Sequence, residues 1–218
     1  MAPIHFGFLM IPYQALDVVG PLDVLSSCSA EYIKEMEAHG VPKGISEKAP
    51  EIVFHHIGLT MEAVKLTGNY HVQPTTTYDK CPPLDYLLVG GPKPDYQLPP
   101  EFAKFLQTRV KEVKVLFSTC TGGMVLAAAG LLDGRNATTN HGVVPAAREI
   151  FPKVKWTTER QWVVDGNLWT AGGACAGMDA MAEWVVSNYG EDVAEAGFSA
   201  LDYERRDVEG KRVPLKKF

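Results

Sequence analysis

The feature of this chain that most constrains its fold is a pair of short apolar runs, each of which ends in a glycine-rich turn. Residues 84–91, LDYLLVGG, are nearly all apolar and end in two glycines, as is typical of a parallel strand that is buried on both faces. A second run, KVLFS at residues 114–118, leads through Cys120 and Thr121 into a helical pattern of small residues. Strands that alternate with helices in this way favour a mostly parallel sheet with helices on both faces.

The remaining segments continue this alternation. Strands are expected at residues 4–10, 51–58, 63–68, 71–79, 136–140 and 154–159, with a β-hairpin at residues 160–172 that turns at Asp165-Gly166. Helices are expected to begin near residue 20 and to cover residues 100–113, 122–134, 143–151, 175–189 and 191–203. Gly134 is expected to cap the helix over residues 122–134.

The length of 218 residues favours one domain that spans residues 1–218. Residues 31–50 are polar and broken by glycines and prolines, so we expect a surface insertion with one short helix. Residues 204–218 mix both signs of charge and are expected to form a solvated tail.

Composition excludes several classes of function. The formal net charge of −5 provides no basic field for nucleic acid or for an anionic membrane, and no apolar run is long enough to span a bilayer. The N-terminus lacks the basic region of a signal peptide. The four cysteines form no CxxC pair, so we interpret them as reduced thiols in a cytoplasmic protein. The histidines show no metal-ligand spacing, and we expect neither a metal nor a cofactor.

Cys120 stands where the strand over residues 114–118 meets the following helix. A thiol at a helix N-terminus faces the positive end of the helix dipole, which favours the thiolate. The N–H groups of Thr121 and Gly122 would point toward an anion held there. This arrangement suits a nucleophile beside half an oxyanion hole. The alternative is a buried, inert cysteine that packs like alanine, and position alone leaves both interpretations open.

Several separated motifs resemble one known superfamily. They are LDVVGPLDVL, CPPLDYLLV with the LVGG that ends it, STCTGGMVLAAAGLLDGRNATTN and WVVDGNLWTAGGACAGMDAMAEWV. In order and spacing they are similar to the ThiJ/PfpI (DJ-one) superfamily, a class I glutamine amidotransferase-like domain, and most of all to its isonitrile (isocyanide) hydratase branch and fungal relatives. The resemblance implies a flavodoxin-like three-layer sandwich with a nucleophile-elbow cysteine.

The resemblance also assigns three catalytic residues: Cys120 as the nucleophile, Asp17 as the carboxylate against its sulfur, and Thr121 as the threonine that follows the nucleophile. A carboxylate beside a thiolate is expected to be protonated, because burial and the like charge both raise its pKa. Such a group can donate a hydrogen bond to sulfur and a proton to substrate. Without the resemblance, Asp17 would be interpreted as a helix cap or turn residue.

The sequence departs from the superfamily pattern at two places. Where many relatives have Pro-Gly-Gly, this chain has Gly90, Gly91 and Pro92, and proline carries no N–H. We therefore expect the oxyanion donors to come from Gly91 or from the helix side at Gly122, while a plain tight turn remains the alternative for Gly90-Gly91.

The second departure follows the nucleophile, where protease-like relatives carry a histidine and this chain carries Thr121. A Cys-His dyad of that type is therefore not expected. Asn140 takes the place of a histidine in a common TTH pattern, and His141 lies one position further on. Either residue could line the substrate pocket, and a loop position without a catalytic role is the alternative for both.

The function implied by the resemblance is that of a cofactor-independent lyase. Such a hydratase converts an isocyanide into an N-substituted formamide through a thioimidate on Cys120, with Asp17 as general acid. Two alternatives stay open: a glyoxalase-like, carbonyl-directed activity at the same cysteine, and a non-enzymatic redox-sensing or protective role. A transcription regulator is disfavoured, because such relatives carry an additional helix-turn-helix domain for which the chain leaves no room after the core. The expected partners are a small electrophilic substrate and a second copy of the chain in a homodimer, with no nucleic acid and no membrane.

Overall fold

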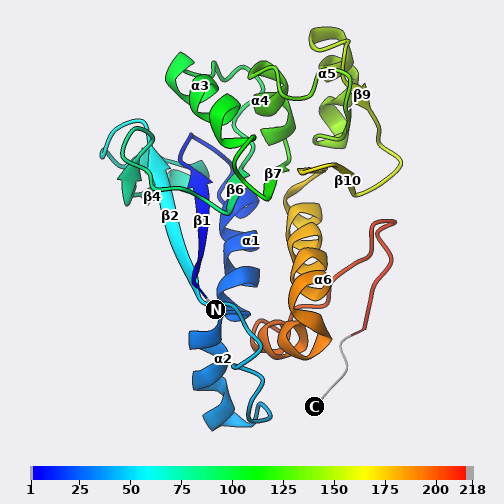
Figure 1. Ribbon diagram of the computed structural model, residues 1–218. Coiled ribbons are helices and arrows are strands. Elements are labelled where there is room, and N and C mark those ends of the chain that lie inside the picture. Colours follow the sequence, from blue (N-terminus) through cyan, green and yellow to red (C-terminus); the bar gives the residue numbers. More distant parts are fainter. Residues whose placement is uncertain (1, 215–218) are drawn as a thin grey trace.

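The apolar runs of the sequence pair side by side in one seven-stranded sheet in the computed structural model, which describes residues 2–214 (Figure 1). Across the sheet the order is β10 (Trp162–Asp165), β11 (Leu168–Ala171), β7 (Val115–Thr119), β6 (Tyr86–Val89), β1 (Ile4–Leu9), β2 (Ile52–Gly58) and β5 (Thr76–Thr77). Every neighbouring pair is parallel except the hairpin β10–β11. The predicted α/β class, a flavodoxin-like sheet with an antiparallel edge, is confirmed.

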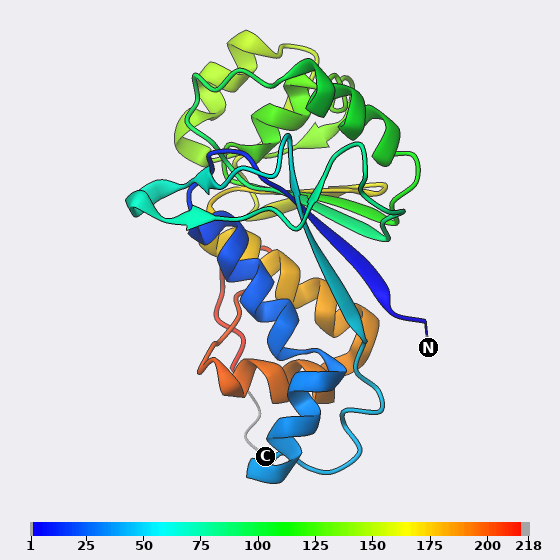
Figure 2. The same cartoon turned by 90° about the vertical axis from the view of Figure 1, so that its left-hand side faces the viewer.

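Helices cover both faces of the sheet (Figure 2). They are α1 (Leu16–Ser27), α2 (Ala30–Met36), α3 (Pro100–Arg109), α4 (Gly122–Ala128), α5 (Val144–Ile150) and α6 (Ala174–Ala200). Figure 2 shows α1 and α6 on one face and α3 to α5 on the other. The shorter elements are β3 (Val64–Lys65), β4 (His71–Val72), β8 (Asn136–Ala137), β9 (Lys155–Trp156) and the 3-10 turns η1 (Glu37–His39), η2 (Thr67–Asn69) and η3 (His141–Val143). No helix within residues 2–214 is long and apolar enough to cross a membrane.

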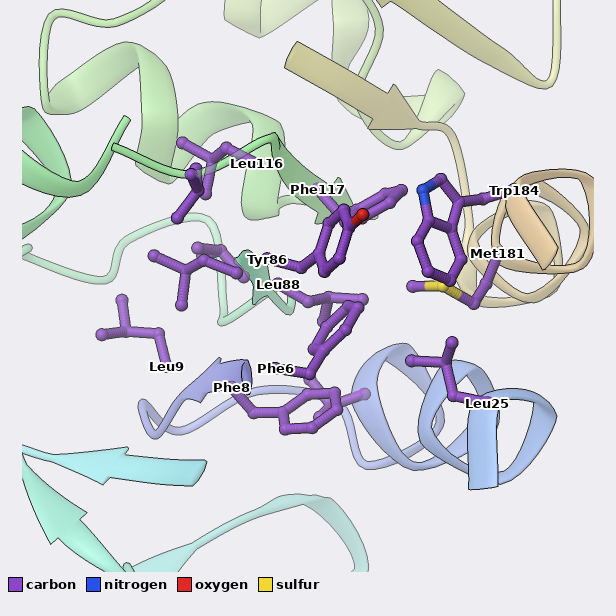
Figure 3. Close-up of a cluster of buried hydrophobic side chains, with 14 of the residues drawn as sticks. Phe6, Phe8, Leu9, Leu25, Tyr86, Leu88, Leu116, Phe117, Met181 and Trp184 are labelled. Atoms are coloured by element: carbon purple, nitrogen blue, oxygen red, sulfur yellow. The ribbon is translucent and has the colours of Figure 1, made fainter. Parts of the chain in front are cut away.

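The core between the sheet and α6 is built from aromatic side chains (Figure 3). Phe6, Tyr86 and Phe117 lie on the neighbouring strands β1, β6 and β7. The ring of Phe6 stacks on that of Tyr86 at 5.7 Å and on that of Phe117 at 5.9 Å between ring centres. Trp184 of α6 meets the Tyr86 ring edge-on at 4.7 Å and is 2% exposed. Edge-to-face contacts add roughly 1 kcal/mol each to the burial of apolar area. This cluster holds the three strands whose ends carry the candidate site.

Three helix boundaries differ by four residues or more from the sequence-based expectation. α3 ends at Arg109, four residues before the expected end at residue 113. α1 begins at Leu16, four residues earlier than expected, which places Asp17 in its first turn. α4 ends at Ala128, because Gly130 adopts a left-handed φ of 75° and the N–H of Leu131 bonds to the carbonyl of Leu126. That pattern is a Schellman cap, so the prediction that Gly134 caps this helix was wrong.

The break expected between the last two helices is present. Gly190 has a φ of 84° and kinks α6 between residues 189 and 191. The hairpin turn falls at residues 166–167, one position later than expected, because Asp165 still pairs with Leu168. Residues 31–50 contain α2 and η1, and a loop then returns to β2, with Ile33 and Ile45 buried beneath it.

The segment after α6 needs a correction, because its first part is not a free, solvated tail. The backbone N–H and the guanidinium Nε of Arg206 donate to the carboxylate of Asp179 at 2.9 and 2.8 Å. The N–H of Gln161 donates to the carbonyl of Val208 at 2.9 Å. Residues 204–208 are therefore half-buried against α6 and β10, while residues 215–218 lie outside the described part of the chain.

Candidate active site

The candidate site lies at the ends of three adjacent strands. β7, β6 and β1 are neighbours and run parallel, so their carboxyl ends meet at one edge of the sheet. The chain leaves β7 at Cys120, β6 at Gly91 and β1 toward Asp17. In sheets of this kind the crevice at the carboxyl ends of the strands is where ligands bind.

Cys120 occupies a strained turn between β7 and α4. Its φ of 56° is left-handed, which a residue other than glycine adopts only at a cost of about 1–3 kcal/mol. Four hydrogen bonds hold its backbone in this conformation, one of them from the N–H of Gly123 to the Cys120 carbonyl at 3.4 Å. Its N–H donates to the carbonyl of Ala171 at 3.1 Å, and its carbonyl accepts from the N–H of Asn140 at 3.3 Å and from the hydroxyl of Thr139 at 2.8 Å. The expected nucleophile elbow is present in this geometry.

Asp17 is completely buried beside this elbow. Its Oδ2 accepts a hydrogen bond from the N–H of Gly91 at 2.9 Å, whereas its Oδ1 has no hydrogen-bond partner of good geometry among the described residues. Burial raises the pKa of Asp17 to about 7, although the Gly91 N–H and the Cys120 thiol both act to lower it. The carboxyl is therefore protonated in a large part of the molecules at neutral pH, with one oxygen free to carry the proton.

The sulfur of Cys120 responds to the same surroundings. Burial raises the pKa of the Cys120 thiol, and the negative charge of Asp17 raises it further, while hydrogen bonds from Asn140 and Thr121 partly oppose the rise. The helix N-terminus acts in the expected direction, because the N–H of Thr121 lowers this pKa, but burial and the Asp17 carboxylate outweigh it. At rest the pair is a neutral thiol beside a carboxyl that is protonated in about half of the molecules at neutral pH.

Gly91 is the point at which the three loops touch. A Cβ at this position would lie 2.6 Å from the backbone nitrogen of Thr121 and 2.8 Å from Oδ2 of Asp17, so any larger residue would push the site apart. The Gly91 N–H is engaged by Asp17 and is not free to bind a substrate anion, in contrast to the expected oxyanion role. The hydroxyl of Thr121 donates a hydrogen bond to the carbonyl oxygen of Pro92, which holds this hydroxyl against the loop after β6.

Asn140 and His141, which the sequence treated alike, have different surroundings. The side-chain amide Nδ2 of Asn140 donates to the sulfur of Cys120 at 3.4 Å, and its Oδ1 accepts from the N–H of Gly142. His141 instead places its Nε2 3.2 Å from the carbonyl of Arg160. Asn140 lines the cleft above the sulfur, and His141 is not among the described residues that do. Only Asn140 therefore joins the candidate site.

Gly122 is the first residue of α4 and is not among the described residues that line the cleft over the sulfur. A Cβ on this residue would lie 2.3 Å from the carbonyl oxygen of Val89, so the glycine lets α4 start directly against the end of β6. Cys175 lies elsewhere: it is exposed at the start of α6, and Tyr203 and Arg206 are the groups whose pKa it affects. Within residues 2–214, no three histidine, cysteine or acidic side chains are grouped as metal ligands would be.

A cleft of about 930 Å³ opens over the sulfur. Its lining combines the loops after β1 and β6, the strand β3 and the turn before α5. The lining residues are Pro12, Gln14, Lys65, Leu66, Thr67, Gly91, Pro92, Lys93, Pro94, Asp95, Tyr96, Cys120, Thr121, Asn140 and Val143. Sequence reasoning did not identify the residues of this rim, because neither Lys65 in the short strand β3 nor Lys93 and Tyr96 in the loop after β6 belong to a motif. A cleft of this volume accommodates a small organic substrate.

Comparison with known proteins agrees with this geometry. The DJ-1/PfpI family model matches residues 16–187. The chain is 30% identical to the isonitrile hydratase of Pseudomonas putida over 92% of this chain and 78% of that protein. It is 31% identical to the HTH-type transcriptional regulator GbdR of Pseudomonas aeruginosa, over 75% of this chain but only 45% of the regulator.

Solved structures show the same fold. A ThiJ/PfpI family protein from Pseudomonas syringae superposes with a TM-score of 0.76 at 24% identity, covering 95% of this chain and 78% of that one. DJ-1beta of Drosophila melanogaster superposes with a TM-score of 0.68 at 16% identity, over 92% of this chain and 98% of that one. The elbow cysteine, the sheet order and the family match together lead to one conclusion: this chain belongs to the DJ-1/PfpI family.

Proposed function

We propose that this chain is a cofactor-independent cysteine hydratase, a lyase that adds water to an isocyanide and releases an N-substituted formamide. The observation that carries the proposal is the pair formed by Asp17 and Cys120. A buried carboxyl with a pKa of about 7 and an unbonded Oδ1 stands beside a neutral thiol at the end of the cleft. Such a pair supplies an acid and a nucleophile at neutral pH without a metal or a cofactor.

The pair suits the chemistry of an isocyanide, whose terminal carbon accepts a proton before it accepts a nucleophile. Asp17 gives its proton to that carbon, which becomes electrophilic. The sulfur of Cys120 then forms a bond to the carbon and passes its own proton to the Asp17 carboxylate. The product of these steps is a thioimidate, in which the former isocyanide nitrogen is doubly bonded to carbon and Asp17 is protonated again.

Water completes the reaction. It adds to the thioimidate carbon, the nitrogen takes a proton, and the carbon–sulfur bond breaks to release the formamide. Asp17 donates and accepts the protons of these steps, and the departing sulfur recovers one proton. The amide of Asn140, 3.4 Å from the sulfur, stabilises the negative charge that develops on the sulfur as the bond breaks.

The first test is the replacement of the nucleophile. Cys120→Ser should reduce the hydration of a small aryl isocyanide to the uncatalysed rate, because the hydroxyl is a much weaker nucleophile than the thiol. Formation of the formamide is followed by chromatography. Cys175→Ser is the matched control, because this cysteine is exposed and lies outside the cleft lining; it should retain the activity. Full turnover by Cys120→Ser would refute the proposal.

The same experiment separates the alternatives. Methylglyoxal is assayed beside the isocyanide, because a carbonyl carbon could also accept the sulfur of Cys120; turnover of methylglyoxal alone would replace the hydratase by a carbonyl-directed enzyme. A redox-sensing role is less well supported, since peroxide attacks the thiolate and both burial and Asp17 raise the pKa of Cys120. Intact mass after mild peroxide measures this directly.

Three further expectations remain proposals: a homodimer, a cytoplasmic location and a small molecule in place of nucleic acid as the partner. The last of these is the most exposed to challenge, because some relatives are named transcriptional regulators. A gel-shift assay with mixed duplex DNA at low salt tests whether the chain binds nucleic acid. We expect no shift, because the net charge of −5 repels the phosphate backbone. Light scattering tests the dimer.

A further inference from the structure

The rim of the cleft carries two lysines for which the hydratase proposal has no use. Lys65 ends β3, and Lys93 follows Pro92 in the loop after β6. Both side chains are exposed, and neither forms an ion pair among the described residues. Asp95 is the only acidic residue of the described cleft lining. The rim is therefore cationic on balance.

This charge contrasts with the rest of the chain, whose formal net charge is −5. A local patch of opposite sign at the entrance of a cleft concentrates ligands of the opposite charge and speeds their approach. Cys120 is 8% exposed and lies deep in the cleft, whereas the two lysines are exposed at its rim. The ammonium groups therefore stand at the entrance that a substrate passes before it reaches the sulfur.

We infer that the cleft selects electrophiles that carry an anionic group, such as a carboxylate. Lys65 and Lys93 attract that group, and Gln14 and Thr67 offer polar contacts beside them. Lysine is a flexible point charge and is not selective for one anion geometry, so the selected class is anionic electrophiles in general. This inference rests on the proposed function for its substrate, an isocyanide with an acidic substituent.

The test uses two alkylating reagents that differ mainly in charge. In both reactions the Cys120 thiolate forms a bond to the reagent's methylene carbon and iodide leaves. Iodoacetate brings a carboxylate into the cleft, and iodoacetamide brings a neutral amide. The ratio of their rates at Cys120, measured by peptide mass spectrometry at pH 9, reports the charge of the cleft without any turnover. The exposed Cys175 of the same chain is the internal reference.

The variants remove one charge at a time. Lys65→Gln and Lys93→Gln should each lower the iodoacetate-to-iodoacetamide ratio at Cys120 by roughly two- to fivefold, the size expected for an exposed ion pair. The ratio at Cys175 should not change. Lys43→Gln, in the loop that follows α2 and η1, is the matched control and should leave both ratios unaltered. In the unmodified chain, 0.5 M salt should lower the ratio at Cys120 toward that at Cys175.

An unchanged ratio in the double variant Lys65→Gln/Lys93→Gln would overturn the inference, and so would a Cys120 that reacts with neither reagent. A second assay compares isocyanoacetate with its neutral ethyl ester as substrates, and the unmodified chain should have the higher kcat/KM for isocyanoacetate.

The two proposals can fail separately. If neither isocyanide is hydrated while the alkylation ratio still depends on the lysines, the hydratase is wrong and the anion-selective cleft stands. If both isocyanides are hydrated equally and the alkylation ratio is insensitive to the lysines, the hydratase proposal stands and the anion-selective cleft is wrong.

Discussion

Two buried aspartates, both near the N-terminal ends of the packed helices α1 and α6, have opposite surroundings. Asp179 on α6 is 1% exposed, and its two oxygens accept hydrogen bonds from the Tyr203 hydroxyl and from the backbone and guanidinium of Arg206. Asp17 on α1 is also buried, yet it accepts one good hydrogen bond and faces a thiol instead of a cation.

The difference shows how a buried aspartate with a structural role can be distinguished from one that is suited to proton transfer. The Asp179 carboxylate, whose two oxygens are both hydrogen-bonded, has a structural role: its pair with Arg206 anchors residues 204–208 onto α6. A buried carboxyl without a cation keeps its proton, because ionisation in a desolvated site is costly. The group that the fold leaves incompletely satisfied is therefore the one that is able to exchange a proton with a substrate.

Asp17→Asn is expected to have the largest effect of the changes that leave Cys120 in place. The amide oxygen can still accept the Gly91 N–H, so the fold is retained, but the side chain can no longer donate an acidic proton. kcat/KM for isocyanide hydration should fall by about 10²–10⁴, the usual contribution of a general acid. Asp23→Asn, an exposed change on the same helix, is the control. Activity of Asp17→Asn within threefold of the unmodified chain would show that Asp17 is not the acid.

The pH dependence of stability should show the cost of burying Asp17. Its pKa rises from 3.8 to about 7 on folding, so between these values the unfolded chain loses the proton and the folded chain keeps it. Stability therefore falls as the pH rises from about 4 to 7, by up to about 4 kcal/mol at about 1.4 kcal/mol per pKa unit.

Asp17→Asn should remove this pH dependence, so that the variant matches the unmodified chain at pH 4 and is more stable at pH 8. Urea denaturation at each pH provides the comparison. For the unmodified enzyme, kcat/KM should decline as the pH rises through about 7, because the acid is lost. A flat stability profile between pH 4 and 8 in the unmodified chain would contradict the raised pKa.

Arg206→Met tests the other aspartate by leaving Asp179 without its cation. The free energy of unfolding at pH 7 should drop by about 2 kcal/mol, below the roughly 3–5 kcal/mol expected for a fully buried pair, because the arginine is half-exposed. Isocyanide turnover by the folded fraction should be retained, since Arg206 lies outside the cleft lining. Chemical denaturation and kinetics on the same sample separate the two readouts. A loss of kcat without a loss of stability would mean that this corner belongs to the site.

Asn140→Ala is expected to have the smallest effect of these substitutions. It tests whether Asn140 or His141 supports the sulfur, which the sequence alone could not decide. Removal of the amide that donates to the sulfur should slow alkylation of Cys120 at pH 7 by roughly two- to tenfold, the size of one hydrogen bond. His141→Ala should leave the rate unchanged, because its ring bonds to the Arg160 carbonyl. Equal effects of the two substitutions would show that the loop as a whole, and not Asn140, supports the sulfur.

Most of the fold could be predicted from local patterns. The buried strands, the hairpin and the break at Gly190 all follow from apolar runs and glycines, whose effects act within a few residues. The end of α4 could not be predicted, because Gly130 and Gly134 are equally good caps and only the packing of Leu131 beneath the helix selects the first. The half-buried segment after α6 was missed for the same reason: its partner Asp179 is 27 residues away in the chain.

The candidate site divides in a similar way. The position of Cys120 at a strand–helix junction is a local feature, and the resemblance to relatives pointed to Asp17. The direction of the Cys120 pKa was not accessible, because desolvation depends on everything that surrounds the sulfur and outweighs the dipole of a short helix. The engagement of the Gly91 N–H by Asp17 likewise depends on a contact between residues 74 positions apart.

By itself, then, the sequence determined the alternation of strands and helices, the elbow that places a thiol at a strand–helix junction, and the glycines that let α4 begin there, because each depends on short-range backbone geometry. Only the tertiary structure decided which polar groups are left unsatisfied. Pairing Asp179 with Arg206 while leaving Asp17 beside Cys120 is a choice made by packing, since burial and hydrogen-bond partners come from segments distant in the chain. That choice sets the protonation of the site and thereby the chemistry that the cleft can perform.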